Sequence, residues 1–377
     1  MNYVQVLGIT FVILLGWAMG AIVLPQILLV SFRRRLFDSI DDRKIHKALV
    51  PRFGGFAFFP CVLVTVSLAI VGQNLWYGRN VLDMDVTNQM LSSSSCLFLL
   101  YMVGIMDDLV GVRYRTKFVA QTIAGIILTA SGCWFNNLYG FLGIHELPFY
   151  VGIPLTVFAV VFILNAINMI DGIDGLASGI SIIAFIVMGC MFVRLHWWVY
   201  AFVCFAAFGT LLPFFYRNVF GDASKGRKLF MGDTGSLTIG MLLAVMVIRL
   251  SMFDATKERI FPESIVIVFS LLLVPIFDVL RVTLHRLRCG KNPFVADKNH
   301  IHHKFLALGM HQHLALVMIL GIAIAFIAMN ILLLHILSIT AIFFIDLAVW
   351  TIMHMGLTRA INKKTKTKEL NPPVTEK

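Results

Sequence analysis

Long apolar stretches separated by short polar segments recur along the whole chain of 377 residues. About 17–25 apolar residues form a helix long enough to cross the hydrocarbon core of a bilayer. The pattern predicts about eleven such helices, over residues 4–30, 54–72, 91–106, 118–136, 150–168, 177–193, 197–216, 235–251, 264–284, 314–331 and 336–355. We therefore expect an all-α fold, a polytopic transmembrane bundle that forms one domain over 1–356. The basic tail over 357–377 is polar enough to be disordered.

The charge distribution gives this bundle an orientation. Only 14% of the residues are charged, against roughly 25% in a soluble domain. The net charge of +11 would suit a nucleic-acid-binding protein, but most of the 31 Lys and Arg fall on one side of the predicted membrane. The five on the other side are Arg79, Arg194, Arg249, Lys257 and Arg259. The positive-inside rule then places the N-terminus outside and the C-terminus in the cytosol, and we expect no nucleic-acid partner.

Acidic residues gather on the predicted cytosolic side, at the ends of several helices. Asp107 and Asp108 end one span, Asp171 and Asp174 follow another, and Asp233 lies between glycines just before a third. Ionisable groups at the membrane edge are costly and commonly mark a pathway or a site. Adjacent carboxylates resist joint ionisation, so a divalent cation or a basic partner would stabilise them. A solvated loop and simple helix capping remain alternatives for these acids.

The segment NMIDGIDGLASG, over 168–179, offers oxygen atoms as its metal ligands. Asn168 and Asp171 are three residues apart and would be neighbours on a helical face. Gly172 and Gly175 allow the backbone to approach a ligand closely. Oxygen ligands favour a hard cation such as Mg²⁺.

Histidines and cations lie on the same side of the predicted membrane. His300, His302 and His303 could bind zinc, but no cysteine is near them. A solvated loop is a second alternative, and hydrogen bonding to a phosphate or a sugar is the interpretation we favour. Further phosphate-binding side chains on this side are Lys44, His46, Arg52, Lys117 and Arg286. Acids for magnesium together with bases for phosphates indicate phosphoryl transfer, with a soluble nucleotide donor and a lipid acceptor.

Five motifs in order carry a family resemblance: RKIHKALVPRFGG, DDLVGVRYRTK, NMIDGIDGLASG, MGDTGSL and RLRCGKNPFVADKNHIHHKF. In these motifs the chain resembles the polyprenyl-phosphate N-acetylhexosamine-1-phosphate transferases of glycosyltransferase family 4. The match covers roughly residues 33–310. The resemblance implies about eleven helices in the bacterial cytoplasmic membrane, a cytosolic active site and Mg²⁺, with Mn²⁺ as a substitute. It also implies a UDP-N-acetylhexosamine donor, undecaprenyl phosphate as acceptor, the lipid bilayer as surroundings, and a homodimer as one arrangement.

The resemblance implies a role for each candidate residue. The catalytic group comprises Asp107, Asp108, Asp171 and Asp174. The metal group comprises Asn168, Asp171 and Asp233. The substrate-binding group comprises Lys44, His46, Arg52, Lys117, Arg286, His300, His302 and His303. The lipid phosphate would attack the β-phosphorus of the UDP-sugar and release UMP, either directly or through an acyl-phosphate on an aspartate.

Several other functions stay open at this point. The motifs PRFGG and DKNHIHH and the short cytosolic loops favour N-acetylglucosamine 1-phosphate over UDP-MurNAc-pentapeptide, whose peptide needs more room. The product would then start a lipid-linked glycan of the cell envelope. An ion-coupled transporter would place its acids near the bilayer midplane and in related halves. A membrane aromatic prenyltransferase would carry two similar Asn/Asp clusters rather than four unlike ones.

Overall fold

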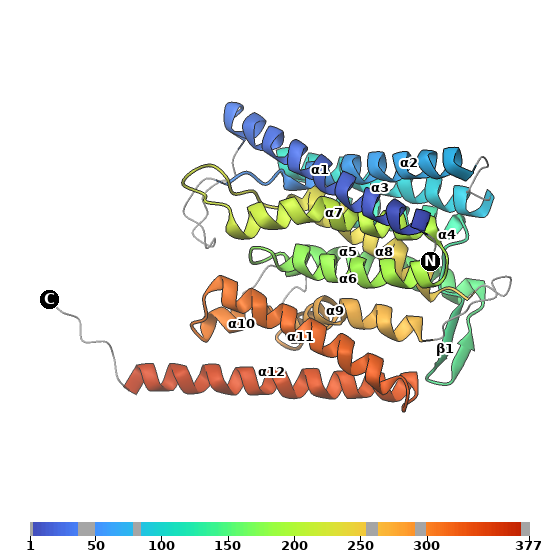
Figure 1. The fold of residues 1–377 in the computed structure, drawn as a ribbon. Coiled ribbons are helices and arrows are strands. Elements are labelled where there is room, and N and C mark those ends of the chain that lie inside the picture. The colour runs from blue at the N-terminus through green and yellow to red at the C-terminus, as the bar shows by residue number, and fades with distance from the viewer. Residues whose placement is uncertain (1–2, 37–49, 78–83, 254–262, 291–298, 371–377) are drawn as a thin grey trace.

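The chain forms long helices that run roughly side by side, as the computed structural model in Figure 1 shows. The structure describes residues 3–36, 50–77, 84–253, 263–290 and 299–370. The elements are α1 (Tyr3–Arg33), η1 (Gly54–Ala57), α2 (Phe58–Tyr77), α3 (Met84–Val110), α4 (Tyr114–Ala130), β1 (Asn137–Phe141), β2 (Ile144–Glu146), α5 (Phe149–Ile170), α6 (Leu176–Arg194), α7 (Trp198–Phe220), α8 (Gly232–Ser251), α9 (Ser264–Arg288), α10 (Ile301–Ala307), α11 (Gln312–Leu333) and α12 (Ile339–Leu370).

Each predicted span corresponds to one helix, so the expectation of an all-α polytopic bundle is confirmed. Within the described residues, 10 helices are long and apolar enough to cross a membrane. The 17-residue helix α4 takes the place of the predicted fourth span but ends at Ala130 rather than 136. The chain then forms the small antiparallel hairpin β1–β2, whose strands of 5 and 3 residues are too short to leave a clear alternating pattern.

Helix α8 is the centre of the bundle. Every residue from Thr234 to Ser251 is buried, and α8 packs against α3, α5, α6 and α9. In Figure 1, α1 and α2 lie on one side of this centre and α9, α11 and α12 on the other. Within a bilayer the hydrophobic effect does not drive helices together, so small residues that allow close packing stabilise their contacts. Gly104 of α3 is one of these, since an added Cβ would collide with the backbone of Thr234.

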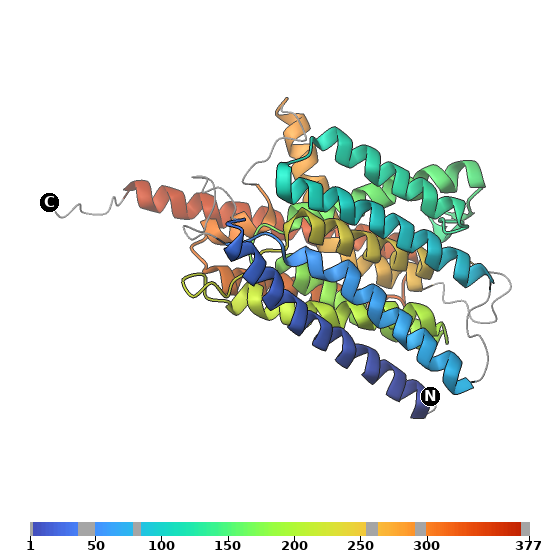
Figure 2. The same cartoon turned by 90° about the horizontal axis from the view of Figure 1, so that it is seen from above.

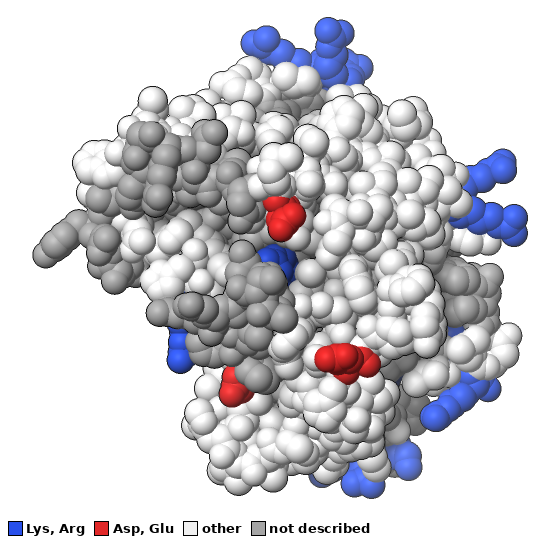
Figure 3. Space-filling view, turned by 90° about the vertical axis from the view of Figure 1, so that its right-hand side faces the viewer, with Lys and Arg blue, Asp and Glu red and all other residues white. Residues whose placement is uncertain are grey.

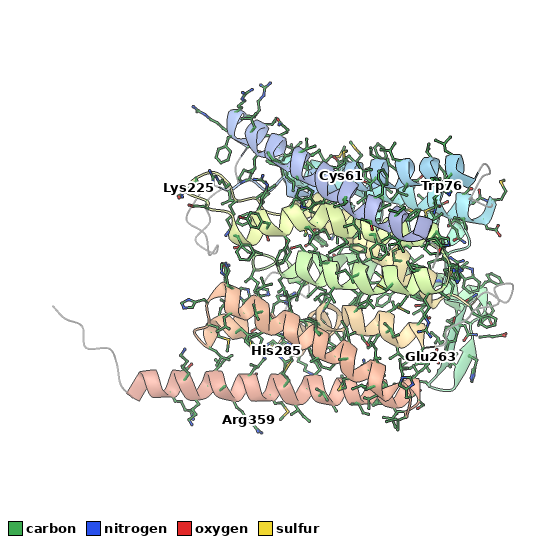
Figure 4. The ribbon with its side chains drawn as sticks, in the orientation of Figure 1. Cys61, Trp76, Lys225, Glu263, His285 and Arg359 are labelled. Carbon is green, nitrogen blue, oxygen red and sulfur yellow. The ribbon has the colours of Figure 1, made fainter. Side chains whose placement is uncertain are left out.

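The two ends of the bundle differ. We call the end at which α3 ends and α8 begins the motif end, and the end that carries β1–β2 the hairpin end. The N-terminus lies at the hairpin end and the C-terminus at the motif end (Figure 1). Lys225 lies at the motif end, whereas Trp76 and Glu263 lie at the hairpin end (Figure 4). Seen from the hairpin end, the described Lys and Arg side chains protrude mainly at the rim (Figure 3).

Helix α12 continues beyond the predicted end of the membrane domain at 356. It remains helical to Leu370, so the part of the predicted disordered tail over 357–370 is a helix. Lys304 of α10 donates a hydrogen bond to Thr358 Oγ1 at 2.9 Å, and Lys364 donates to the Leu308 carbonyl at 2.6 Å. These contacts with α10 and the residue after it stabilise the polar end of α12. A search for apolar periodicity cannot predict this part of the helix.

Candidate functional site

Three acids from two distant segments meet at the motif end. Asp107 and Asp108 lie near the end of α3, and Asp233 lies in the first turn of α8. Carboxylate oxygens of the three residues lie within 4.8 Å of one another. We call these three residues the acid cluster. The close approach of α3 to α8 at Gly104 and Thr234 brings them together.

Asp108 holds the N-terminus of α8. Its Oδ1 accepts the backbone N–H of Asp233 at 2.8 Å. Its Oδ2 accepts the backbone N–H of Thr234 at 3.0 Å and the Thr234 hydroxyl at 2.6 Å. Gly232 has a φ of +72°, and an added Cβ would meet Asp108 and the Arg52 carbonyl, so glycine suits this turn. Asp108 thus satisfies the free N–H groups that begin a helix and fixes Asp233 in place.

Lys117 bridges the other two acids. Its ammonium lies 2.7 Å from Asp107 Oδ2 and 2.9 Å from Asp233 Oδ1. The amide nitrogen of Asn168 donates to Asp233 Oδ1 and to Ser236 Oγ, each at 2.7 Å. Four helices, α3, α4, α5 and α8, therefore converge on one polar centre. Sequence reasoning assigned Lys117 to substrate binding, whereas in the structure its ammonium contacts two residues of the acid cluster.

The donor set suits a divalent cation. Asp107, Asp108 and Asp233 offer carboxylate oxygens, which are ligands that Mg²⁺ prefers in proteins. Asn168 turns its amide nitrogen toward Asp233, so its side-chain amide would have to rotate to present its oxygen to a cation. Two of the three carboxylates contact the single ammonium of Lys117, so the acid cluster carries more negative charge than this lysine neutralises. A cation bound here would supply the missing positive charge.

Asp171 and Asp174 lie in the loop between α5 and α6 and differ in surroundings. Asp171 directly follows α5 and is half-buried. Burial and the charges of Asp174 and Asp233 raise the pKa of the Asp171 carboxyl to about 7, against an opposing effect of Arg52. Asp171 is not a member of the acid cluster among the described residues.

Asp174 forms a buried ion pair. Its Oδ2 lies 2.6 Å from the ammonium of Lys228, and both side chains are buried. Next to it, the backbone N–H of Gly175 donates to Asn218 Oδ1 at 2.6 Å, and Asn218 in turn donates to the Leu229 carbonyl. These bonds tie the α5–α6 loop to the α7–α8 loop. Lys228 lies in no motif, so sequence reasoning did not find it.

Asp278 of α9 organises the start of α10. Its side chain is fully buried and lies 2.8 Å from His300 Nδ1, and it accepts the backbone N–H of Ile301 at 3.0 Å. Arg281 donates to Asp278 at 2.9 Å and to the Asn299 carbonyl at 2.5 Å. His300 is therefore held by protein groups. Asp278 received no role from the sequence, because its partners His300 and Ile301 lie more than twenty residues along the chain.

His302 contacts the loop that carries the acids. An added Cβ at Gly172 would collide with the His302 imidazole, which places α10 against the α5–α6 loop. Burial and the neighbouring His303 lower the pKa of His302 to about 3, so the ring is neutral at physiological pH. A neutral imidazole can donate one hydrogen bond and accept another. Among the described residues, the three histidines do not form a metal-binding group.

The remaining substrate-binding candidates are Arg52, Arg286, Lys44 and His46. The backbone on either side of Arg52 is hydrogen-bonded to Phe230, in the segment before α8. The Phe230 N–H donates to the Pro51 carbonyl, and the Gly54 N–H donates to the Phe230 carbonyl, each at 2.9 Å. Arg286 is buried in the last turn of α9. Lys44 and His46 lie outside the described residues.

The chain resembles known membrane transferases. The sequence profile of glycosyl transferase family 4 matches residues 90–251. The undecaprenyl-phosphate alpha-N-acetylglucosaminyl 1-phosphate transferase of Yersinia pestis is 31% identical over 304 residues, which cover 80% of this chain and 77% of the relative. The protein of the same name from Escherichia coli K12 is 29% identical, over 75% of this chain and 72% of its own length. A Bacillus subtilis relative, named as a probable undecaprenyl-phosphate N-acetylglucosaminyl 1-phosphate transferase, is 29% identical over 81% and 79%.

Proposed function

The chain belongs to glycosyl transferase family 4, and on this basis we propose that it transfers N-acetylglucosamine 1-phosphate from a UDP-sugar to undecaprenyl phosphate. The observation that carries the proposal is the convergence of Asp107, Asp233, Asn168 and Lys117 from four helices at the motif end. Relatives that cover most of the chain carry the name of this activity. The basic loops favour a cytosolic position for the motif end in the bacterial cytoplasmic membrane.

In this proposal the acid cluster is the metal site. Asp107 and Asp233 would hold Mg²⁺, or Mn²⁺ in its place, and Asn168 would join them after rotation of its side-chain amide. The ion would supply Lewis-acid neutralisation of phosphate oxygens when bound. Lys117 keeps the two aspartates close together while its ammonium offsets part of their charge. Asp108 acts as a positioning residue, because both of its oxygens already accept hydrogen bonds from α8.

The transfer itself forms one P–O bond and breaks another. A phosphate oxygen of the lipid attacks the β-phosphorus of the UDP-sugar, and the bond from that phosphorus to the bridging oxygen breaks to release UMP. Asp107 would position the acceptor phosphate. Asp171 is suited to accept its proton, because a pKa of about 7 lets the carboxyl exchange a proton near neutral pH.

The donor would lie beside the contact between the α5–α6 loop and α10. His302 faces this loop at Gly172 as a neutral hydrogen-bonding group, which suits a sugar hydroxyl or a diphosphate oxygen. Arg286 and Arg52 would add positive charge for the diphosphate. Asp174 and His300 would act indirectly, since their partners Lys228 and Asp278 belong to the protein.

The decisive experiment uses purified protein with undecaprenyl phosphate, Mg²⁺ and a panel of UDP-sugars. We expect UMP release and a lipid product whose mass increases by an N-acetylhexosamine phosphate. Product from UDP-MurNAc-pentapeptide and none from any UDP-N-acetylhexosamine would overturn the donor assignment. Ion-coupled uptake into vesicles without UMP release would overturn the enzymatic proposal as a whole.

A further inference from the structure

A cavity of about 520 Å³ lies between α9, α10 and α12, outside the acid cluster. Helix α9 separates the two regions. Its residues Asp278, Val282 and Arg286 are buried, whereas Arg281, Leu284, His285 and Arg288 line the cavity. In Figure 2 the C-terminal end of α9 projects away from the neighbouring helices. This helix contains Pro275, and proline is a common cause of helix kinks. His285 and Arg359 both lie toward the motif end (Figure 4).

The lining combines positive charge with apolar surface. The cationic lining residues are Arg281, Arg288, Lys304 and Arg359, with His285 and His354 beside them. The described lining residues include no Asp or Glu. Burial lowers the pKa of Lys304 to about 8, with a smaller lowering by the charge of Arg281 and an opposing effect of Asp278. We call this the cationic cavity.

Two buried side chains of the lining have polar atoms without a hydrogen-bond partner in the described structure. His354 is 5% exposed, and neither of its ring nitrogens has a hydrogen bond. Trp350, one helical turn earlier, is 3% exposed, and its Nε1 also lacks a partner. Buried polar groups are almost always hydrogen-bonded, so these two side chains are exceptions beside the cationic cavity.

One side of the cationic cavity meets the lipid-facing surface. Leu280 and Leu284 of α9 and Met355 of α12 line it and are also exposed on the outside of the bundle. A ligand with an apolar chain could therefore place its chain along these residues and its anionic group among the cations. Basic pockets between transmembrane helices at the cytosolic interface bind anionic lipid head groups in this way.

We propose that the cationic cavity binds the phosphate head group of an anionic membrane phospholipid. Lys304 donates to Thr358 from the α10 helix that also carries His302, so a bound phosphate would join α9, α10 and α12. The proposal does not rest on the transferase activity, because binding can be measured without turnover.

The test measures lipid retention by native mass spectrometry. The intact protein is placed in phosphatidylcholine nanodiscs that contain increasing amounts of phosphatidylglycerol. We expect one phosphatidylglycerol molecule to be retained in preference to phosphatidylcholine. The double variant R288Q/R359Q changes two exposed side chains and should weaken this retention about tenfold or more. The matched control R34Q removes an exposed cation at the end of α1, on the opposite side of the bundle, and should retain phosphatidylglycerol as the wild type does.

Four outcomes would overturn the proposal. Equal retention by the double variant, or equal retention of phosphatidylcholine, would show that the cations do not select an anionic lipid. Displacement by millimolar inorganic phosphate would assign the cationic cavity to a free anion. Displacement by a small amount of undecaprenyl phosphate would assign it to the polyprenyl lipid instead. The thermal midpoint of each variant confirms that it is folded.

Discussion

The acid cluster and the cationic cavity hold charge in opposite ways. In the acid cluster, Asp108 is bonded by α8, and Lys117 and Asn168 bond the remaining carboxylates. In the cationic cavity, Arg281 pairs with Asp278 behind the lining, whereas the other cations have no acid among the described lining residues. The bundle thus holds the acids at the first site with its own groups, whereas we propose that the second site receives its counter-charge from an external anion. Variants that change one region should leave the other intact.

The largest effect should come from Asp233→Asn. This change removes a charged oxygen from the acid cluster while keeping the size of the side chain, so turnover should fall about a thousandfold. UMP release by purified protein measures the effect. Asp222→Asn, at an exposed aspartate of the neighbouring α7–α8 loop, is the control and should keep normal activity. Activity of Asp233→Asn within twofold of the wild type would remove Asp233 from the site.

Breaking the Asp174–Lys228 pair should mainly reduce stability. Asp174→Asn leaves the buried ammonium of Lys228 uncompensated, which costs about 3–5 kcal/mol of unfolding free energy. The thermal midpoint in detergent measures the loss. The double variant Asp174→Asn with Lys228→Met should recover part of it, because no buried charge remains. An unchanged midpoint in Asp174→Asn would contradict the importance of this pair.

His302→Ala should weaken donor binding. Loss of one neutral hydrogen-bonding group should raise the KM for the UDP-sugar about tenfold and leave the Mg²⁺ dependence unchanged. Steady-state kinetics at several Mg²⁺ concentrations separate the two effects. The exposed His313 offers a control, since His313→Ala should change neither constant. A shifted Mg²⁺ requirement in His302→Ala would instead link this histidine to the metal.

The smallest effect concerns Asp171 and pH. Its pKa is raised in the folded protein, from the usual 3.8 to about 7, so the folded state favours the protonated carboxyl. Metal-free protein should therefore lose stability as the pH rises from about 4 to 7 and change little beyond. We expect Asp171→Asn to raise the thermal midpoint at pH 8 by about 2 °C and to flatten this dependence. A midpoint lower than that of the wild type at pH 8 would contradict the assignment.

The sequence predicted features that depend on local pattern. Apolar runs located the eleven helices because a bilayer imposes their length. The motifs located Asp107, Asp108 and Asp233 because acids at helix ends are unusual next to a membrane. The orientation of the bundle and the roles of these acids stay predictions.

Features that depend on distant partners were not predicted. The pairing of Asp174 with Lys228 and of His300 with Asp278 joins segments that no local pattern connects. A further case lies within the membrane domain, where Asn330 donates to Ser270 Oγ at 2.7 Å and to Asp346 Oδ2 at 2.8 Å. Both Asn330 and Asp346 are fully buried. The residues next to Asp346 in the sequence are apolar, so the hydropathy pattern predicts an ordinary membrane span there.

The extended end of α12 has a practical consequence for handling the protein. Lys364 bonds the Leu308 carbonyl, and Thr358 bonds Lys304, so the last turns of α12 brace the helix that carries His302. An affinity tag or a fluorescent fusion joined at residue 356 would cut away this brace, although every apolar span would still be present. Fusion partners should be attached after Leu370, where the helix is complete.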